Sequence, residues 1–94
     1  MKFSEVYRKY SEDEYLEFDR VKNKASLRPD VNAFVVLDNL FPSDGDLVSC
    51  AEHDEIWLNV EPNELDILSL EQMLDLIRCG VRYDPETDSL TMFV

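Results

Sequence analysis

The first quarter of the chain has the apolar spacing of a helix. Between residues 3 and 26 the apolar side chains form a loose stripe at helical intervals. Ser11 and Glu14 have the spacing of a capping box, which marks a helix start. Pro29 ends the segment, because the residue before a proline avoids the helical conformation. We therefore predict an N-terminal helix that stops before Pro29.

Three short segments that follow have the patterns of β-strands. Residues 33–37 are a continuous apolar run rich in β-branched side chains, which favours a buried central strand. Residues 47–51 lie between two segments rich in turn formers and predict a second strand. Residues 55–60 alternate, with Ile56 on one face of the predicted strand and Trp57 on the other. These segments predict a three-stranded antiparallel meander with one covered face.

The last third of the chain predicts a second helix and a hairpin. Ser69 and Gln72 form a capping box, and the apolar residues that follow are spaced as on one helix face. Gly80 is the residue type expected just past a helix end. Residues 81–83 and 90–93 flank a four-residue turn that begins with proline, which is typical of a β-hairpin.

The predicted fold is therefore a small α+β domain in the order α-β-β-β-α-β-β. With 94 residues and 45% hydrophobic side chains, the chain is long enough for one core, and we expect one domain over residues 1–94. Charge divides it into two parts. Residues 1–28 form a charge-balanced helical segment of net charge +1, whereas residues 29–94 form an acidic body of −13. Such a body repels nucleic acid and anionic membranes and attracts basic surfaces.

Sequence motifs for chemistry are weak throughout the chain. Cys50 and His53 have a metal-ligand spacing, but a zinc site requires a second pair, and Cys79 stands alone. The turn around Gly45 lacks the acids of a calcium loop, and two glycines in all cannot form a phosphate-binding loop. We expect His53 on a surface turn, both cysteines reduced and buried, no metal or cofactor, and no enzymatic activity.

The acidic residues around the predicted turns are the candidate binding residues. Trp57 faces away from the apolar side of its strand; either a helix covers it or it is a partly exposed binding anchor. The acids near it have no basic residue between them and either aid solubility or meet a basic partner. The candidate binding set is Asp44, Asp46, Glu52, Asp54, Glu55, Trp57, Glu61, Glu64 and Asp66.

In size and charge the chain is similar to small acidic inhibitors encoded by phages and other mobile elements, including DNA mimics, and to acidic antitoxins and immunity proteins. This resemblance implies an inhibitor that occupies the nucleic-acid-binding surface of a basic protein or nuclease complex. The alternative is an assembly module that forms homodimers through the apolar helix and through residues 90–94 as a free strand edge. The start of the chain has no apolar signal-peptide region, so we expect a cytoplasmic protein, in the host cytoplasm if a phage encodes it.

Overall fold

In the computed structural model, which describes residues 1–94, the first helix is shorter than the sequence predicts. Helix α1 spans Phe3–Glu14, and a 3-10 turn at Phe18–Arg20 is the one helical element between it and residue 29. Tyr15 is extended, and Leu16 takes a φ of 61°, in the left-handed region. The Leu16 N–H then donates to the carbonyl of Ile77, 3.3 Å away. The predicted helix to residue 26 is wrong, because the chain leaves α1 to bond with a later helix.

The Ser11–Glu14 capping box is also wrong, since both residues lie inside α1 rather than at a helix start. The helix end predicted at Pro29 is wrong as well. Helix α2 spans Pro29–Leu40 and begins with that proline, whose fixed φ suits the first helical position. The predicted strand at 33–37 is thus the middle of a helix.

Four strands form one antiparallel sheet, with β2 and β4 in its interior. The strands are β1 (Val48–Glu52), β2 (Glu55–Leu58), β3 (Arg82–Asp84) and β4 (Ser89–Phe93), in the spatial order β1-β2-β4-β3. The α+β class is confirmed. The meander is reduced to the β1–β2 hairpin, because its first predicted strand is helical. All five residues of the edge strand β1 are exposed, so Cys50 is exposed and its predicted burial is wrong.

Both surfaces predicted for self-association are occupied within the chain. Strand β4 is paired on both sides, so it is not a free edge. The predicted second helix is confirmed as α3 (Leu70–Arg78), and most of its apolar side chains are buried in the chain's own core. Its capping box is also confirmed, because Ser69 and Gln72 each accept the other's backbone N–H. Gly80 follows with a φ of 103°, as a glycine past a helix end allows.

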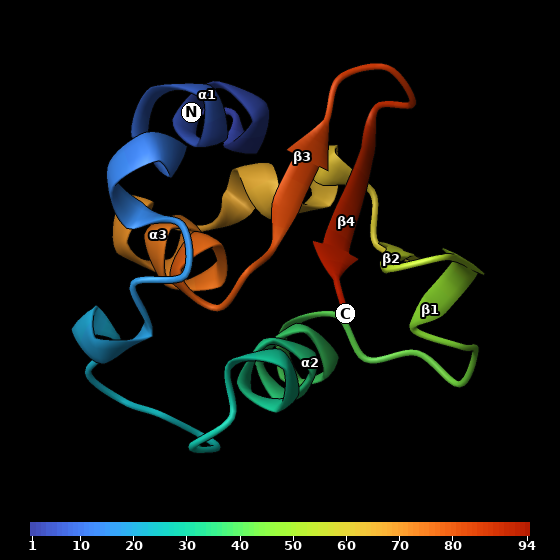
Figure 1. Ribbon diagram of the computed structural model, residues 1–94, viewed down its shortest axis with the longest axis horizontal. Helices are drawn as coiled ribbons and strands as arrows, with labels where there is room; N and C mark the ends of the chain where they lie inside the picture. The colour runs from blue at the N-terminus through green and yellow to red at the C-terminus, as the bar shows by residue number, and fades with distance from the viewer.

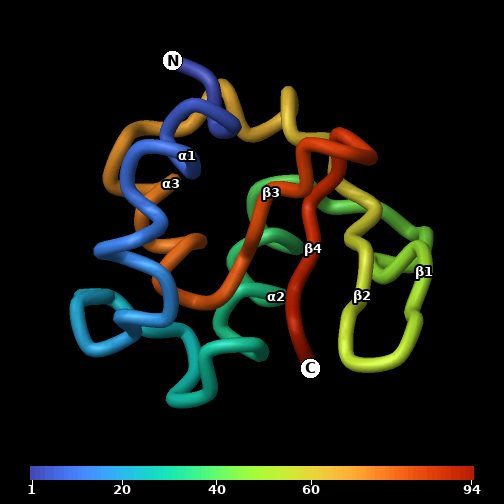
Figure 2. The backbone as a smooth tube through the Cα atoms, turned by 45° about the horizontal axis from the view of Figure 1, so that its top comes forward, coloured from blue at the N-terminus to red at the C-terminus, as the bar shows by residue number.

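The helices and one face of the sheet enclose the core. Helices α1 and α3 lie side by side, and the β1–β2 hairpin lies at the opposite side of the molecule (Figures 1 and 2). An ion pair links α1 to α3, since Arg78 bonds to Glu14 as well as to Asp75 of its own helix. Helix α2 is joined to the end of α3 by a hydrogen bond from the buried Asn32 amide to the Cys79 sulfur. No helix has the length and apolar character of a membrane-spanning segment.

Candidate protein-binding face

The β1–β2 hairpin displays several of the predicted binding residues at its tip. A two-residue turn, His53–Asp54, joins the strands, and His53 takes a φ of 54° there. His53 is exposed, as predicted for a surface turn. The carbonyl of Asp54 accepts the Val94 N–H at 2.7 Å, which ties the turn to the residue that follows β4. The tip is therefore held by the sheet rather than left as a free loop.

Strand register places Trp57 on the face of the sheet that points away from the core. Trp57 is opposite Cys50 on β1 and Thr91 on β4, while Glu55 is opposite Phe93. Directly opposed residues share a face, and alternate residues of a strand do so as well. We call this the outer face; its members at the hairpin end are Cys50, Glu52, Glu55, Trp57, Thr91 and Phe93.

The outer face is partly open. Trp57 is half-buried, and Phe93 remains 54% exposed. Neighbouring residues on β2 and β4, Ile56 and Met92, point the other way and are buried in the core. The sequence left two alternatives for Trp57, a covered side chain or a partly exposed anchor, and the structure has the partly exposed side chain.

A cation of the chain itself lies on this face. Arg82, on β3, donates from Nη1 to Oε2 of Glu55 at 3.3 Å. Its guanidinium carbon lies 4.2 Å from the centre of the Phe93 ring, a cation–π contact. Aromatic and acidic groups of the outer face thus already bind one guanidinium. Thr91, opposite Arg82 in the sheet, is fully buried, and its hydroxyl oxygen has no hydrogen-bond partner.

A shallow depression of about 270 Å³ lies at the hairpin tip. Its lining residues are Glu52, His53, Asp54, Glu55, Trp57 and Phe93. Glu52 and Asp54 are exposed, and neither carboxylate makes a hydrogen bond or ion pair within the chain. Glu55 is already paired with Arg82, but the two unpaired carboxylates and the two aromatic rings suit a further cationic group. The structure therefore brings four of the predicted residues together: Glu52, Asp54, Glu55 and Trp57.

Three further candidates belong to a different element: Glu64 and Asp66 lie on the 3-10 helix η2 (Pro62–Ile67), and Glu61 is its N-cap. Glu64 accepts the backbone N–H of Glu61 at 2.7 Å, which caps η2. Asp66 accepts the N–H of Phe3 at 2.8 Å and so fixes the start of α1. Glu64 and Asp66 therefore have structural roles and do not extend the hairpin surface.

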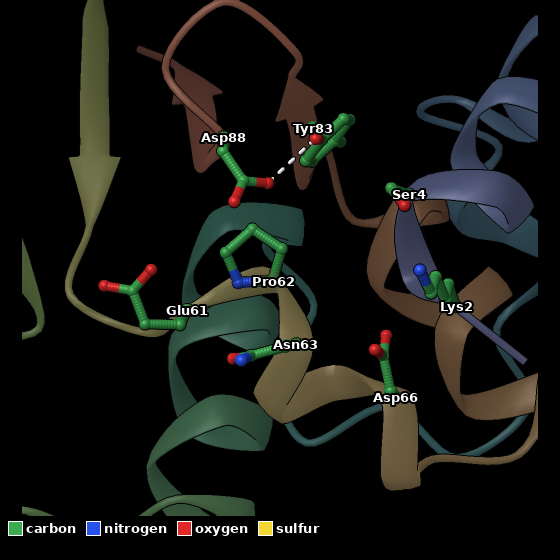
Figure 3. A pocket seen from close by; sticks show the side chains of 8 residues that line it. All are labelled: Lys2, Ser4, Glu61, Pro62, Asn63, Asp66, Tyr83 and Asp88. Atoms are coloured by element: carbon green, nitrogen blue, oxygen red, sulfur yellow. Dashed lines mark hydrogen bonds between the residues drawn. The ribbon is translucent and has the colours of Figure 1, made fainter.

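A second, polar pocket of about 310 Å³ lies beside η2 (Figure 3). It is lined by Lys2, Ser4, Glu61, Pro62, Asn63, Asp66, Tyr83 and Asp88. Tyr83 donates its hydroxyl to Asp88 at 2.8 Å, and this bond raises the pKa of the tyrosine. Figure 3 shows the Asp66 carboxylate pointing toward the segment that carries Lys2 and Ser4. Because Lys2 lies among its carboxylates, this pocket has a more balanced charge than the depression at the hairpin tip.

The last two candidates, Asp44 and Asp46, lie in the loop between α2 and β1. The carbonyl of Asp46 accepts a hydrogen bond from the Asn59 amide, at the end of the hairpin away from its turn. The predicted acids thus occupy three places: this loop, the hairpin tip and η2. No three His, Cys, Asp or Glu side chains are arranged to hold a metal ion.

Sequence reasoning missed Phe93 and Arg82 as members of the face. The available signal was the alternation in the last strand, where Leu90 and Met92 are apolar core residues and Phe93 has the opposite orientation.

Neither protein families, curated proteins nor solved structures yielded a match to this chain.

Proposed function

We propose that this protein is a small acidic inhibitor that binds a basic protein and covers a surface which that partner uses to bind nucleic acid. The observation that supports this most is the depression at the hairpin tip. There, partly exposed Trp57 and Phe93 lie beside Glu52 and Asp54, whose carboxylates have no partner within the chain. Tryptophan is enriched at binding hot spots, and unpaired carboxylates complement the cations of a nucleic-acid groove.

The charge of the whole body favours the same class of partner. Residues 29–94 hold fifteen acids and only two basic residues, Arg78 and Arg82. Both arginines are already paired with carboxylates of the chain. The remaining negative field would accelerate encounter with a basic protein and would disfavour nucleic acid as a ligand.

A binding role fits the chemistry of the site better than a catalytic one. His53 is exposed and no hydrogen bond orients it, whereas a catalytic base is normally held by a third group. Burial raises the pKa of the Cys79 thiol, which keeps that sulfur in its unreactive neutral form. Anti-defence proteins that mimic DNA and immunity proteins against nucleases are both inhibitors of the proposed kind.

Affinity purification from the organism that encodes the chain tests the proposal. We expect a basic, nucleic-acid-binding protein to be recovered at low salt, roughly 50 mM, and progressively lost as salt rises. The double variant Glu52→Gln/Asp54→Asn should bind that protein about ten-fold more weakly, because two charged contacts are lost.

A matched control removes two negative charges elsewhere. Glu12 and Asp19 are exposed and their carboxylates have no partner within the chain. The variant Glu12→Gln/Asp19→Asn has the same net charge as the hairpin variant and should bind like wild type. Recovery of an acidic partner, binding that does not change with salt, or equal losses in both variants would contradict the proposal.

A further inference from the structure

The depression at the hairpin tip contains the groups that would bind a single planar cation. Aromatic rings attract cations over their faces, and carboxylates pair with guanidinium groups in a fork geometry. Trp57 and Phe93 supply the rings, while Glu52 and Asp54 supply carboxylates with no internal partner. The depression is shallow, with a volume of about 270 Å³, so a side chain fits it better than a folded element.

Arg82 indicates which cation these groups accept. Its guanidinium lies 4.2 Å from the centre of the Phe93 ring while it donates to Glu55 at 3.3 Å. One aromatic ring and one carboxylate of the outer face thus bind an arginine together. Phe93 as a whole residue is still 54% exposed despite this contact, so a second group can reach it.

The tip is also preorganised. The Asp54 carbonyl accepts the Val94 N–H, and the backbones of Glu52 and Glu55 lie opposite each other in the register of β1 and β2. Because the turn is held against the end of β4, binding would cost little ordering of the backbone. A preformed site of this kind can discriminate between cations by shape as well as by charge.

We infer that the depression binds an arginine side chain of the basic partner, which stacks on Trp57 and Phe93 and donates to Glu52 or Asp54. This inference rests on the proposed function and adds its chemistry of recognition. A guanidinium is planar and can stack and form a carboxylate fork at once, whereas a lysine ammonium is a compact point charge. The site should therefore prefer arginine to lysine at equal peptide charge.

Trp57 is the only tryptophan in the chain, so its fluorescence reports directly on the depression. The probe is a synthetic peptide with three arginines separated by glycine and serine. Two control peptides replace arginine by lysine, which keeps the charge, or by citrulline, which keeps the shape without charge. We expect a saturable change in Trp57 fluorescence with the arginine peptide, about five-fold weaker affinity for the lysine peptide, and no change with citrulline.

Variants connect the signal to the site. Phe93→Leu keeps an apolar side chain but removes the ring, and it should reduce the preference for arginine over lysine to about two-fold or less. Glu52→Gln/Asp54→Asn should abolish the fluorescence change, whereas Glu12→Gln/Asp19→Asn should retain it.

Equal affinity for the arginine and lysine peptides would overturn the inference, as would an unchanged response in the hairpin double variant. The two proposals fail separately. If a purified basic partner requires Glu52 and Asp54 but the arginine peptide never perturbs Trp57, the proposed function stands and the arginine site is wrong. If no basic partner is recovered, the proposed function fails whatever the peptide does.

Discussion

At the scale of single residues, Arg78 is the side chain that links α3 to α1 through an ion pair. Its side chain is only 10% exposed, and the guanidinium bonds to Glu14 at 2.5 Å and to Asp75 at 2.8 Å. Arg20 binds the second oxygen of Glu14, so this carboxylate joins the end of α1 both to α3 and to the turn that follows. Local sequence indicates only that an arginine in the last turn suits the negative end of a helix, because Glu14 lies far away in the chain.

Glu14→Gln tests this network through pH. The hydrogen bond from Arg78 is the main cause that lowers the pKa of Glu14 below its ordinary value of 4.5, and burial opposes it. A lowered folded-state pKa means that the stabilisation is fully present above pH 4.5 and is lost as the pH falls through the folded value. At pH 7 the variant should lose about 2 kcal/mol of unfolding free energy in urea titrations.

The difference in unfolding free energy between wild type and Glu14→Gln should then become smaller as the pH is lowered from 4.5 to about 3, below the reference carboxyl pKa values. Glu12→Gln, an exposed change on the same helix, serves as the control and should show no such trend. A gap that stays constant over the whole pH range would mean that the Glu14 carboxylate does not stabilise the folded state.

At the scale of elements, the best predicted helix is the one with signals at both ends. Helix α3 has Ser69 at its start and Gly80 after its end, and its apolar residues follow one face. Local hydrogen bonds thus determine its boundaries, and local sequence was enough to place them.

Ser69→Ala removes the start signal of α3. The Gln72 N–H would lose its acceptor, and we expect a loss of about 1 kcal/mol of unfolding free energy in urea. Ser4→Ala is the comparison, since the Ser4 hydroxyl makes no hydrogen bond near the start of α1. If the two variants unfold at the same urea concentration, the cap contributes nothing measurable.

Helix α2 shows where sequence reasoning failed and why. Ala33 and Leu37, one turn apart, are buried, but the residues between them are also apolar and half-buried. A short apolar run without periodicity cannot distinguish a strand from a buried helix. Pro29 was the informative residue, because proline suits the first position of a helix as well as the position after one. The end of α1 was beyond local signals, since Leu16 turns to bond with Ile77.

At the scale of the whole molecule, the acidic body is divided rather than continuous. The four candidates from Glu52 to Trp57 lie close together in the sequence, and the pairing of β1 with β2 across their short turn brings them together. Phe93 and Arg82 join them only through the strand order β1-β2-β4-β3, which no local pattern specifies. Glu64 and Asp66 were separated from the set because backbone N–H groups of η2 and α1 require their carboxylates.

Competition for nucleic acid is the most direct test of the proposed inhibition. Labelled duplex DNA or RNA would be bound to the purified basic partner, and its release would be followed by fluorescence polarisation as this protein is added. We expect wild type and Glu12→Gln/Asp19→Asn to displace the nucleic acid equally, and Glu52→Gln/Asp54→Asn to need about ten-fold more protein. A ternary complex in which the partner keeps its nucleic acid while this protein is bound would contradict the proposal.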